Sequence, residues 1–189
     1  SSRSFPNRKA VIHVDKKAVS IIPREGHEGD IFKNPYIAYN CARVVGETAI
    51  VTNGSHTDPL ADKILLGLPI RDALVNVLAA MDYEKDSYNT PRIAAVVRRG
   101  EARGWLGIVR HDGLDVRSFD LQPGECFHLS TYEHAVPLTQ YKAEFDAATV
   151  AAACDFSLRG GVFAAFTHPV TAVCLLENGQ GFEMAAKDA

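Results

Sequence analysis

The stretch AMDYEKDSYNTPRIAAVV, residues 80–97, joins two segments with different hydrophobic periods. Upstream of it, apolar residues recur at helical spacing: Ile70, Leu74, Val77, Leu78 and Met81. Downstream, residues 93–97 form the short apolar run of a buried strand. The polar link between helix and strand carries a carboxylate in Glu84 and a guanidinium in Arg92. Because catalytic side chains often lie on such connections, the link is a candidate site, and a solvated connector is the alternative.

Strand patterns surround this unit. Residues 41–45 and 48–52 are rich in Val, Ile and Thr, and Gly46-Glu47 between them predicts a tight hairpin. Residues 93–97, 105–109 and 114–119 predict a β-meander. Further strands are expected at 18–22, 127–130, 162–166 and 172–176.

Helix signals complete the pattern. Asp58-Pro59 resembles a helix start with Asp at the cap and Pro at the first position, and Gly67 and Pro69 separate this helix from the one ending near Met81. Residues 142–158 are Ala-rich and predict a third helix, which Gly160-Gly161 would stop. Helices that face antiparallel strands predict one α+β layered domain.

Composition limits the function classes. The 189 residues fit one domain and are 47% hydrophobic, and 20 basic against 23 acidic residues leave a net charge of -3. This balance gives no electrostatic footprint for nucleic acid, and no apolar run reaches the roughly 20 residues of a membrane span. The four cysteines are far apart, which favours free thiols and a cytoplasmic protein over a disulfide scaffold or a zinc site.

Three other segments could bind an anion or a nucleotide. The turn at residues 53–56, Asn-Gly-Ser-His, precedes a helix start, where backbone amides favour a phosphate; a capped turn without a ligand is the alternative. Arg3 and Arg8 in SSRSFPNR could hold phosphate oxygens, or could belong to a solvated segment. Tyr39 in NPYIAYN could present its hydroxyl to a ligand or pack in the core.

Several blocks together are far more specific than any of these signals. They are SSRSFPNR (1–8), EGHEGDIFKNPYIAYNCARVVG (25–46), NGSHTDPLADK (53–63), AMDYEKDSYNTPRIAA (80–95), STYE (130–133) and GGVFAAFTHPVTA (160–172). In this order they resemble the archaeal-type inosine monophosphate (IMP) cyclohydrolase family. The resemblance covers nearly the whole chain and is weakest over 9–19, 98–104 and 138–147.

The resemblance implies an N-terminal-nucleophile-hydrolase-like fold, which is an αββα sandwich of antiparallel sheets. It also implies the last step of purine biosynthesis, in which 5-formamidoimidazole-4-carboxamide ribotide (FAICAR) closes to IMP with loss of water. No cofactor, metal or covalent intermediate is expected. The expected partners are the purine ribonucleotide substrate and product, without nucleic acid or membrane, and the expected assembly is a homo-oligomer.

Residue roles follow from the same resemblance. Arg8, Tyr39 and Glu84 match the family's proposed catalytic positions, with Glu84 as proton acceptor, Tyr39 as donor to the formyl oxygen and Arg8 neutralising developing charge. A second set is expected to contact base, ribose or phosphate: Arg3, Asn40, Asn53, Ser55, His56, Arg92 and Thr167.

The first residue raises an alternative. Members of the family begin with about twenty further residues, whereas the pattern here starts at Ser1, so residues 1–189 are expected to form a single domain that lacks this leading segment. An autoprocessed amidohydrolase could instead use Ser1 as an N-terminal nucleophile. A nucleotide-binding protein without catalysis is a third possibility. The resemblance favours the cyclohydrolase, because that family uses the fold without such a nucleophile.

Overall fold

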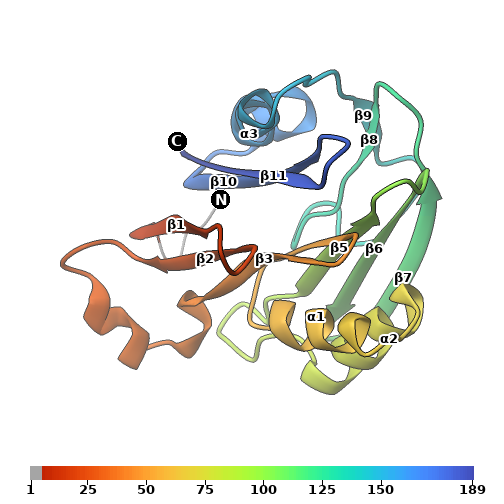
Figure 1. The fold of residues 1–189 in the computed structure, drawn as a ribbon. Coiled ribbons are helices and arrows are strands. Elements are labelled where there is room, and N and C mark those ends of the chain that lie inside the picture. The colour runs from red at the N-terminus through yellow and green to blue at the C-terminus, as the bar shows by residue number, and fades with distance from the viewer. Residues whose placement is uncertain (1–5) are drawn as a thin grey trace.

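The computed structural model describes residues 6–189 and contains a seven-stranded antiparallel sheet within them (Figure 1). The strands follow each other in chain order: β1 (Arg8–His13), β2 (Ala18–Pro23), β3 (Tyr39–Val45), β4 (Thr48–Thr52), β5 (Arg92–Arg98), β6 (Arg103–Arg110) and β7 (Gly113–Asp120). Two short 3-10 helices, η1 (Glu28–Phe32) and η2 (Pro35–Ile37), connect β2 to β3. The expected hairpin and meander are both confirmed.

Two helices between β4 and β5 cover one face of this sheet (Figure 1). They are α1 (Thr57–Leu65) and α2 (Ile70–Met81), and α2 has the bounds that its apolar spacing predicts. Leu60 and Leu74 from these helices pack with Ile50 and Val96 from the sheet, and all four are almost fully buried. This core fixes the end of α2, and therefore the start of the polar link.

A second pair of strands packs on the other face of the sheet (Figure 1). The strands β10 (Thr171–Glu177) and β11 (Phe182–Asp188) form an antiparallel hairpin near β1 and β3, with α3 (Val150–Arg159) on its outer side. Val173 and Leu175 of the hairpin meet the buried Val19 and Ile21 of the large sheet. A separate small sheet pairs β8 (Glu125–Phe127) with β9 (Lys142–Glu144), and a 3-10 helix, η3 (Gly161–Ala165), precedes the hairpin. The chain is therefore an α+β protein with three α-helices among its described residues.

One predicted helix starts later than expected, and one predicted strand is wrong. The helix expected over 142–158 begins only at Val150, because Thr149 is its N-cap and accepts a hydrogen bond from the Ala152 amide at 3.1 Å. The strand expected over 162–166 is η3, because its backbone forms i,i+3 hydrogen bonds: the Phe163 amide donates to the Gly160 carbonyl at 2.9 Å and the Phe166 amide to the Phe163 carbonyl at 3.1 Å.

Two boundaries also differ from expectation, and two strands are additional. The strand expected at 127–130 is β8, which ends at Phe127, and β1 and β11 were not predicted. Helix α1 starts at Thr57 rather than after Asp58, whose carboxylate accepts hydrogen bonds from Asn40 and Arg43 instead of capping the helix. Across residues 6–189, the helices are all too short or too polar to cross a membrane.

Candidate active site

The strand register places Arg8 and Tyr39 on the same face of the sheet. Tyr39 pairs with Ile21, and Ile21 pairs with Ala10, two residues from Arg8. Paired residues on antiparallel strands point to the same side, and side chains alternate along each strand. Both side chains therefore lie on the face toward the β10–β11 hairpin.

The polar link that carries Glu84 is a folded turn. The Glu84 amide donates to the Thr90 carbonyl at 2.9 Å, and the Asp86 carboxylate accepts from the Thr90 amide at 2.9 Å and from its hydroxyl at 2.7 Å. Glu84 is only 7% exposed as a result. The link is thus folded around a buried Glu84, while Lys85 and residues 87–89 within it are exposed. The spacing of Asp86 and Thr90 is the sequence signal that could have indicated this turn.

Arg92 holds this turn from the first position of β5. Its Nη1 donates to Glu84 Oε1 at 3.0 Å, and its Nε donates to the Asp82 carbonyl at 2.9 Å. The guanidinium also lies over the Tyr36 ring, 5.7 Å from the centroid. Both Arg92 and Glu84 are buried, so solvent screens this ion pair only weakly.

The electrostatic environment couples the three family-matched residues. Burial raises the pKa of Glu84 from 4.5 to about 7; the charges of Arg92 and Arg8 oppose this rise, and Asp86 adds to it. Burial also raises the pKa of Tyr39 to about 12, against the charge and hydrogen bond of Arg8 and with a contribution from Glu84. The structure thus brings Arg8, Tyr39 and Glu84 within electrostatic reach of one another. A carboxylate with a pKa near 7 suits a general base, and a protonated phenol suits a donor.

The turn at residues 53–56 packs against the side chains of Glu84 and Arg92. Asn53 donates to the Pro91 carbonyl and accepts from the Ile93 amide, each at 2.9 Å, which fastens the turn to the start of β5. A Cβ on Gly54 would lie 2.8 Å from both Glu84 Oε1 and Arg92 Nη1, so only glycine fits there. Gly54 is therefore a residue of the site that the resemblance did not assign.

His56 belongs to the same turn and is completely buried. Its Nε2 lies 2.9 Å from the Ile93 carbonyl, which can only accept, so Nε2 carries the proton and Nδ1 is a lone pair. This Nδ1 has no hydrogen-bond partner among the described residues and would lie 3.2 Å from a Gly54 Cβ. Burial lowers the pKa of His56 to about 4, and the charge of Arg92 adds to this. His56 is thus neutral, and it packs against the site without an exposed surface for direct contact with ribose.

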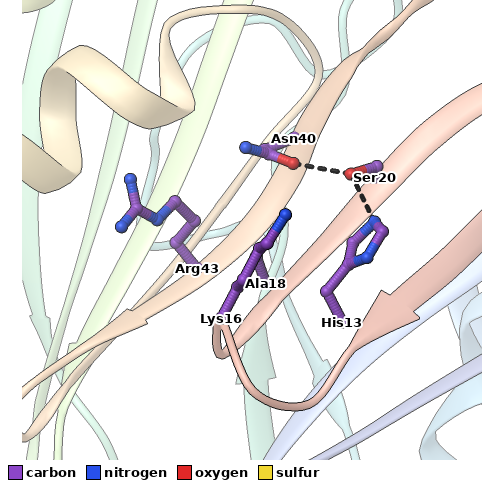
Figure 2. Close-up of a pocket in the computed structure, with 6 residues that line it drawn as sticks. All are labelled: His13, Lys16, Ala18, Ser20, Asn40 and Arg43. Carbon is purple, nitrogen blue, oxygen red and sulfur yellow. Dashed lines mark hydrogen bonds between the residues drawn. The ribbon is translucent and has the colours of Figure 1, made fainter.

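Asn40 lies apart from this group. It pairs with Ser20 on the face toward α1, where its Nδ2 donates to both Asp58 oxygens at 3.0 Å and its Oδ1 accepts from Ser20 Oγ at 2.6 Å. With His13, Lys16 and other residues, Asn40 lines a pocket of about 420 Å³ (Figure 2). These hydrogen bonds already satisfy the Asn40 amide, so the expected substrate contact has no support in its placement.

The remaining predicted contacts are less informative. Ser55 is exposed at the start of the turn before α1, and Thr167 is exposed between η3 and β10. Arg3 and Ser1 lie outside the described residues. Among residues 6–189, no group of three or more His, Cys, Asp and Glu side chains is arranged to hold a metal ion.

Comparisons with known proteins show the family to which the chain belongs. A family model described as "IMP cyclohydrolase-like protein" matches residues 1–181. A protein from Methanosphaera stadtmanae is 47% identical over 189 residues, covering 100% of this chain and 89% of its own length. One from Methanocaldococcus jannaschii is 40% identical over 187 residues, with 99% and 88% coverage. Both relatives are named IMP cyclohydrolase, and the chain belongs to the IMP cyclohydrolase family.

Proposed function

We propose that the chain closes FAICAR to IMP with loss of water. Membership of the family supports the reaction, and one structural observation carries its assignment to residues. This observation is a buried carboxyl, Glu84, whose burial raises its pKa to about 7 and whose charge interacts with Arg8 and Tyr39. Such a carboxyl can accept a proton at neutral pH and release it again within a turnover.

The reaction requires two protons to reach the formyl oxygen. The carboxamide nitrogen attacks the formyl carbon and forms the new C–N bond, and Glu84 takes the proton that this nitrogen loses. Tyr39 donates its proton to the oxygen as negative charge develops there, Arg8 stabilises that charge, and the proton that Glu84 accepted then restores the Tyr39 phenol. Water leaves when the formamido nitrogen has also lost its proton and a C=N bond has formed. Each nitrogen therefore supplies one proton to the departing water.

Both reacting groups belong to one substrate molecule, so positioning contributes much of the rate. Holding the carboxamide nitrogen close to the formyl carbon replaces a conformational search by a single pose. The buried Glu84 turn is suited to this, because its carboxylate is fixed by Arg92 and its backbone by Thr90.

We also infer that the layers form a reduced αββα sandwich. Helices α1 and α2, the seven-stranded sheet, the β10–β11 hairpin and α3 follow one another in that order (Figure 1). The side chains of Arg8 and Tyr39 face the space between the two β-layers. This placement supports substrate binding between the two β-layers.

The test is Glu84→Gln, which keeps the shape of the side chain and an oxygen for Arg92 but cannot accept a proton. We expect IMP affinity within a few-fold of wild type and turnover reduced roughly 100-fold or more, the usual scale for losing a general base. Ultraviolet absorbance follows IMP formation, and calorimetry gives the affinity. The control is Glu101→Gln on the β5–β6 turn, an exposed site that should leave turnover unchanged. Turnover of Glu84→Gln near the wild-type rate would assign the base to another group.

A further inference from the structure

The backbone at Asp82 has a conformation that side chains rarely allow. Asp82 has φ 56° and ψ -179°, a region that is almost exclusive to glycine. It directly follows α2, and its amide still donates to the Leu78 carbonyl at 3.0 Å. The chain must therefore leave the helix abruptly at this residue to bring Glu84 back toward the sheet.

Few contacts hold this strained residue. The Asp82 carboxylate accepts from the Tyr83 amide at 2.9 Å and pairs with the exposed Lys85 at 3.2 Å. The buried contact is to the Asp82 carbonyl, which accepts from Arg92 Nε at 2.9 Å. This last bond is the one that solvent cannot replace without opening the site.

The same guanidinium holds Glu84. Arg92 Nη1 donates to Glu84 Oε1 at 3.0 Å, and the planar group rests over Tyr36. Because a guanidinium is rigid and planar, its two bonds fix the Asp82 carbonyl and the Glu84 carboxylate relative to each other. The Arg92 side chain is 5% exposed, which leaves little surface for a substrate phosphate.

We propose that Arg92 is a positioning residue, whose guanidinium locks the strained Asp82 turn and thereby aims the Glu84 carboxylate at the substrate. Oε1 is held by Arg92, so Oε2 takes the proton. This inference rests on the proposed function for its catalytic part, while the lock itself is a property of the folded chain. It replaces the expectation that Arg92 contacts the nucleotide.

The catalytic test is Arg92→Lys, which keeps the charge but cannot make both bonds with a fixed geometry. We expect kcat to fall roughly 100-fold with KM within a few-fold, because the misplaced Glu84 carboxylate acts in the transition state and not in substrate binding. Arg92→Gln removes the charge that opposes the raised pKa of Glu84, so the acid limb of its kcat profile should move to higher pH, while Arg92→Lys should move it less. Arg103→Lys, an exposed pair with Asp120, is the control. A raised KM with unchanged kcat in Arg92→Lys would instead make Arg92 a substrate ligand and overturn the proposal.

A double-mutant cycle tests the lock without an activity assay, by comparing free energies of unfolding in denaturant. Asp82→Gly relieves the backbone strain, so Arg92→Lys should destabilise the Asp82→Gly protein less than it destabilises the wild type. The double variant should also remain folded. Its kcat should stay as low as that of Arg92→Lys, because Arg92 no longer holds the Glu84 carboxylate in place. Additive stability effects would disprove the lock, whatever the activity. A wild-type protein that forms no IMP would defeat the proposed function instead, and the cycle would still decide the lock.

Discussion

Adding one methyl group at Gly54 should disrupt the site more than its size suggests. In Gly54→Ala the new Cβ would lie 2.8 Å from Glu84 Oε1, 2.8 Å from Arg92 Nη1 and 3.2 Å from His56 Nδ1. Ordinary non-bonded contact requires about 3.5 Å, so the two closest atoms must each move by about 0.7 Å. All three side chains are buried, and two are fixed by further hydrogen bonds, so they cannot swing into solvent.

The expected cost can be set from this displacement. Overpacking a buried site typically lowers stability by about 1–3 kcal/mol. A misplacement of about 1 Å in a catalytic constellation can cost about 100-fold in rate, so a shift of about 0.7 Å should reduce kcat roughly 30-fold. If Arg92 moves away from Glu84, the pKa of Glu84 also rises above its value of about 7. The acid limb of the kcat profile should then move to higher pH.

The assay is IMP formation at saturating substrate from about pH 6 to pH 9, with unfolding in urea measured in parallel. Gly29→Ala is the matched control, because a Cβ there meets nothing within 4 Å. It should change neither kcat nor the pH profile. Gly54→Ala with wild-type kcat and an unshifted acid limb would show that the close packing beneath Glu84 does not matter for catalysis.

The geometry and the pKa shifts also predict the behaviour of other variants. Tyr39→Phe removes a hydroxyl whose pKa of about 12 keeps it protonated, so kcat should fall roughly 100-fold with KM within a few-fold in the same assay; an unchanged kcat would exclude Tyr39 as the donor. Asn40→Ala should leave kcat within a few-fold but lower the free energy of unfolding by about 0.5–1.5 kcal/mol in urea, because Asp58 loses its amide partner while keeping Arg43; a large rise in KM would contradict the placement of Asn40. Glu84 binds its proton more tightly in the folded state, so its contribution to stability is full below about pH 4.5 and is lost as the pH rises to about 7, at up to about 1.4 kcal/mol per pH unit. As the pH rises from 5 to 7, Glu84→Gln should therefore gain stability relative to wild type. His56→Gln should lose stability relative to wild type over the same range, because burial lowers the pKa of His56 to about 4. Urea unfolding at pH 5 and at pH 7 checks both signs, and the same pH dependence in all three proteins would contradict them.

The sequence predicts the elements whose signals are strong and local. Helix α2 has a clear 3.6-residue period between Pro69 and the polar link, and the β3–β4 hairpin has Gly46 at φ 55°, a conformation that suits glycine. Strand β11, FEMAAKD, has little β-propensity and forms because β10 supplies a partner along its whole length. The Ala-rich segment before Val150 fails as a helix for a similar reason, since β8 pairs with Lys142–Glu144.

In the candidate site, too, the sequence indicates some features and not others. The resemblance points to Arg8, Tyr39 and Glu84, but their proximity depends on strand register, which joins residues far apart in the chain. The Asp86–Thr90 turn is local, and only its effect on Glu84 depends on the rest of the fold. The partners of Arg92 could not be predicted either. Whether a guanidinium binds a phosphate or a carboxylate depends on which acceptor the fold brings to it, and here the strained Asp82 turn brings Glu84.

The positions of Arg92 and Asp86 also explain how Glu84 can be both fixed and basic. A guanidinium at 3.0 Å orders the carboxylate but lowers its pKa, which would weaken it as a base. Burial of the whole pair acts in the opposite direction and is the larger effect, and the negative charge of Asp86 adds to it. Asp86 is itself held by three hydrogen bonds from Tyr88 and Thr90 within the link. The turn that first suggests a connector therefore supplies the carboxylate, part of its basicity and the backbone that orients it.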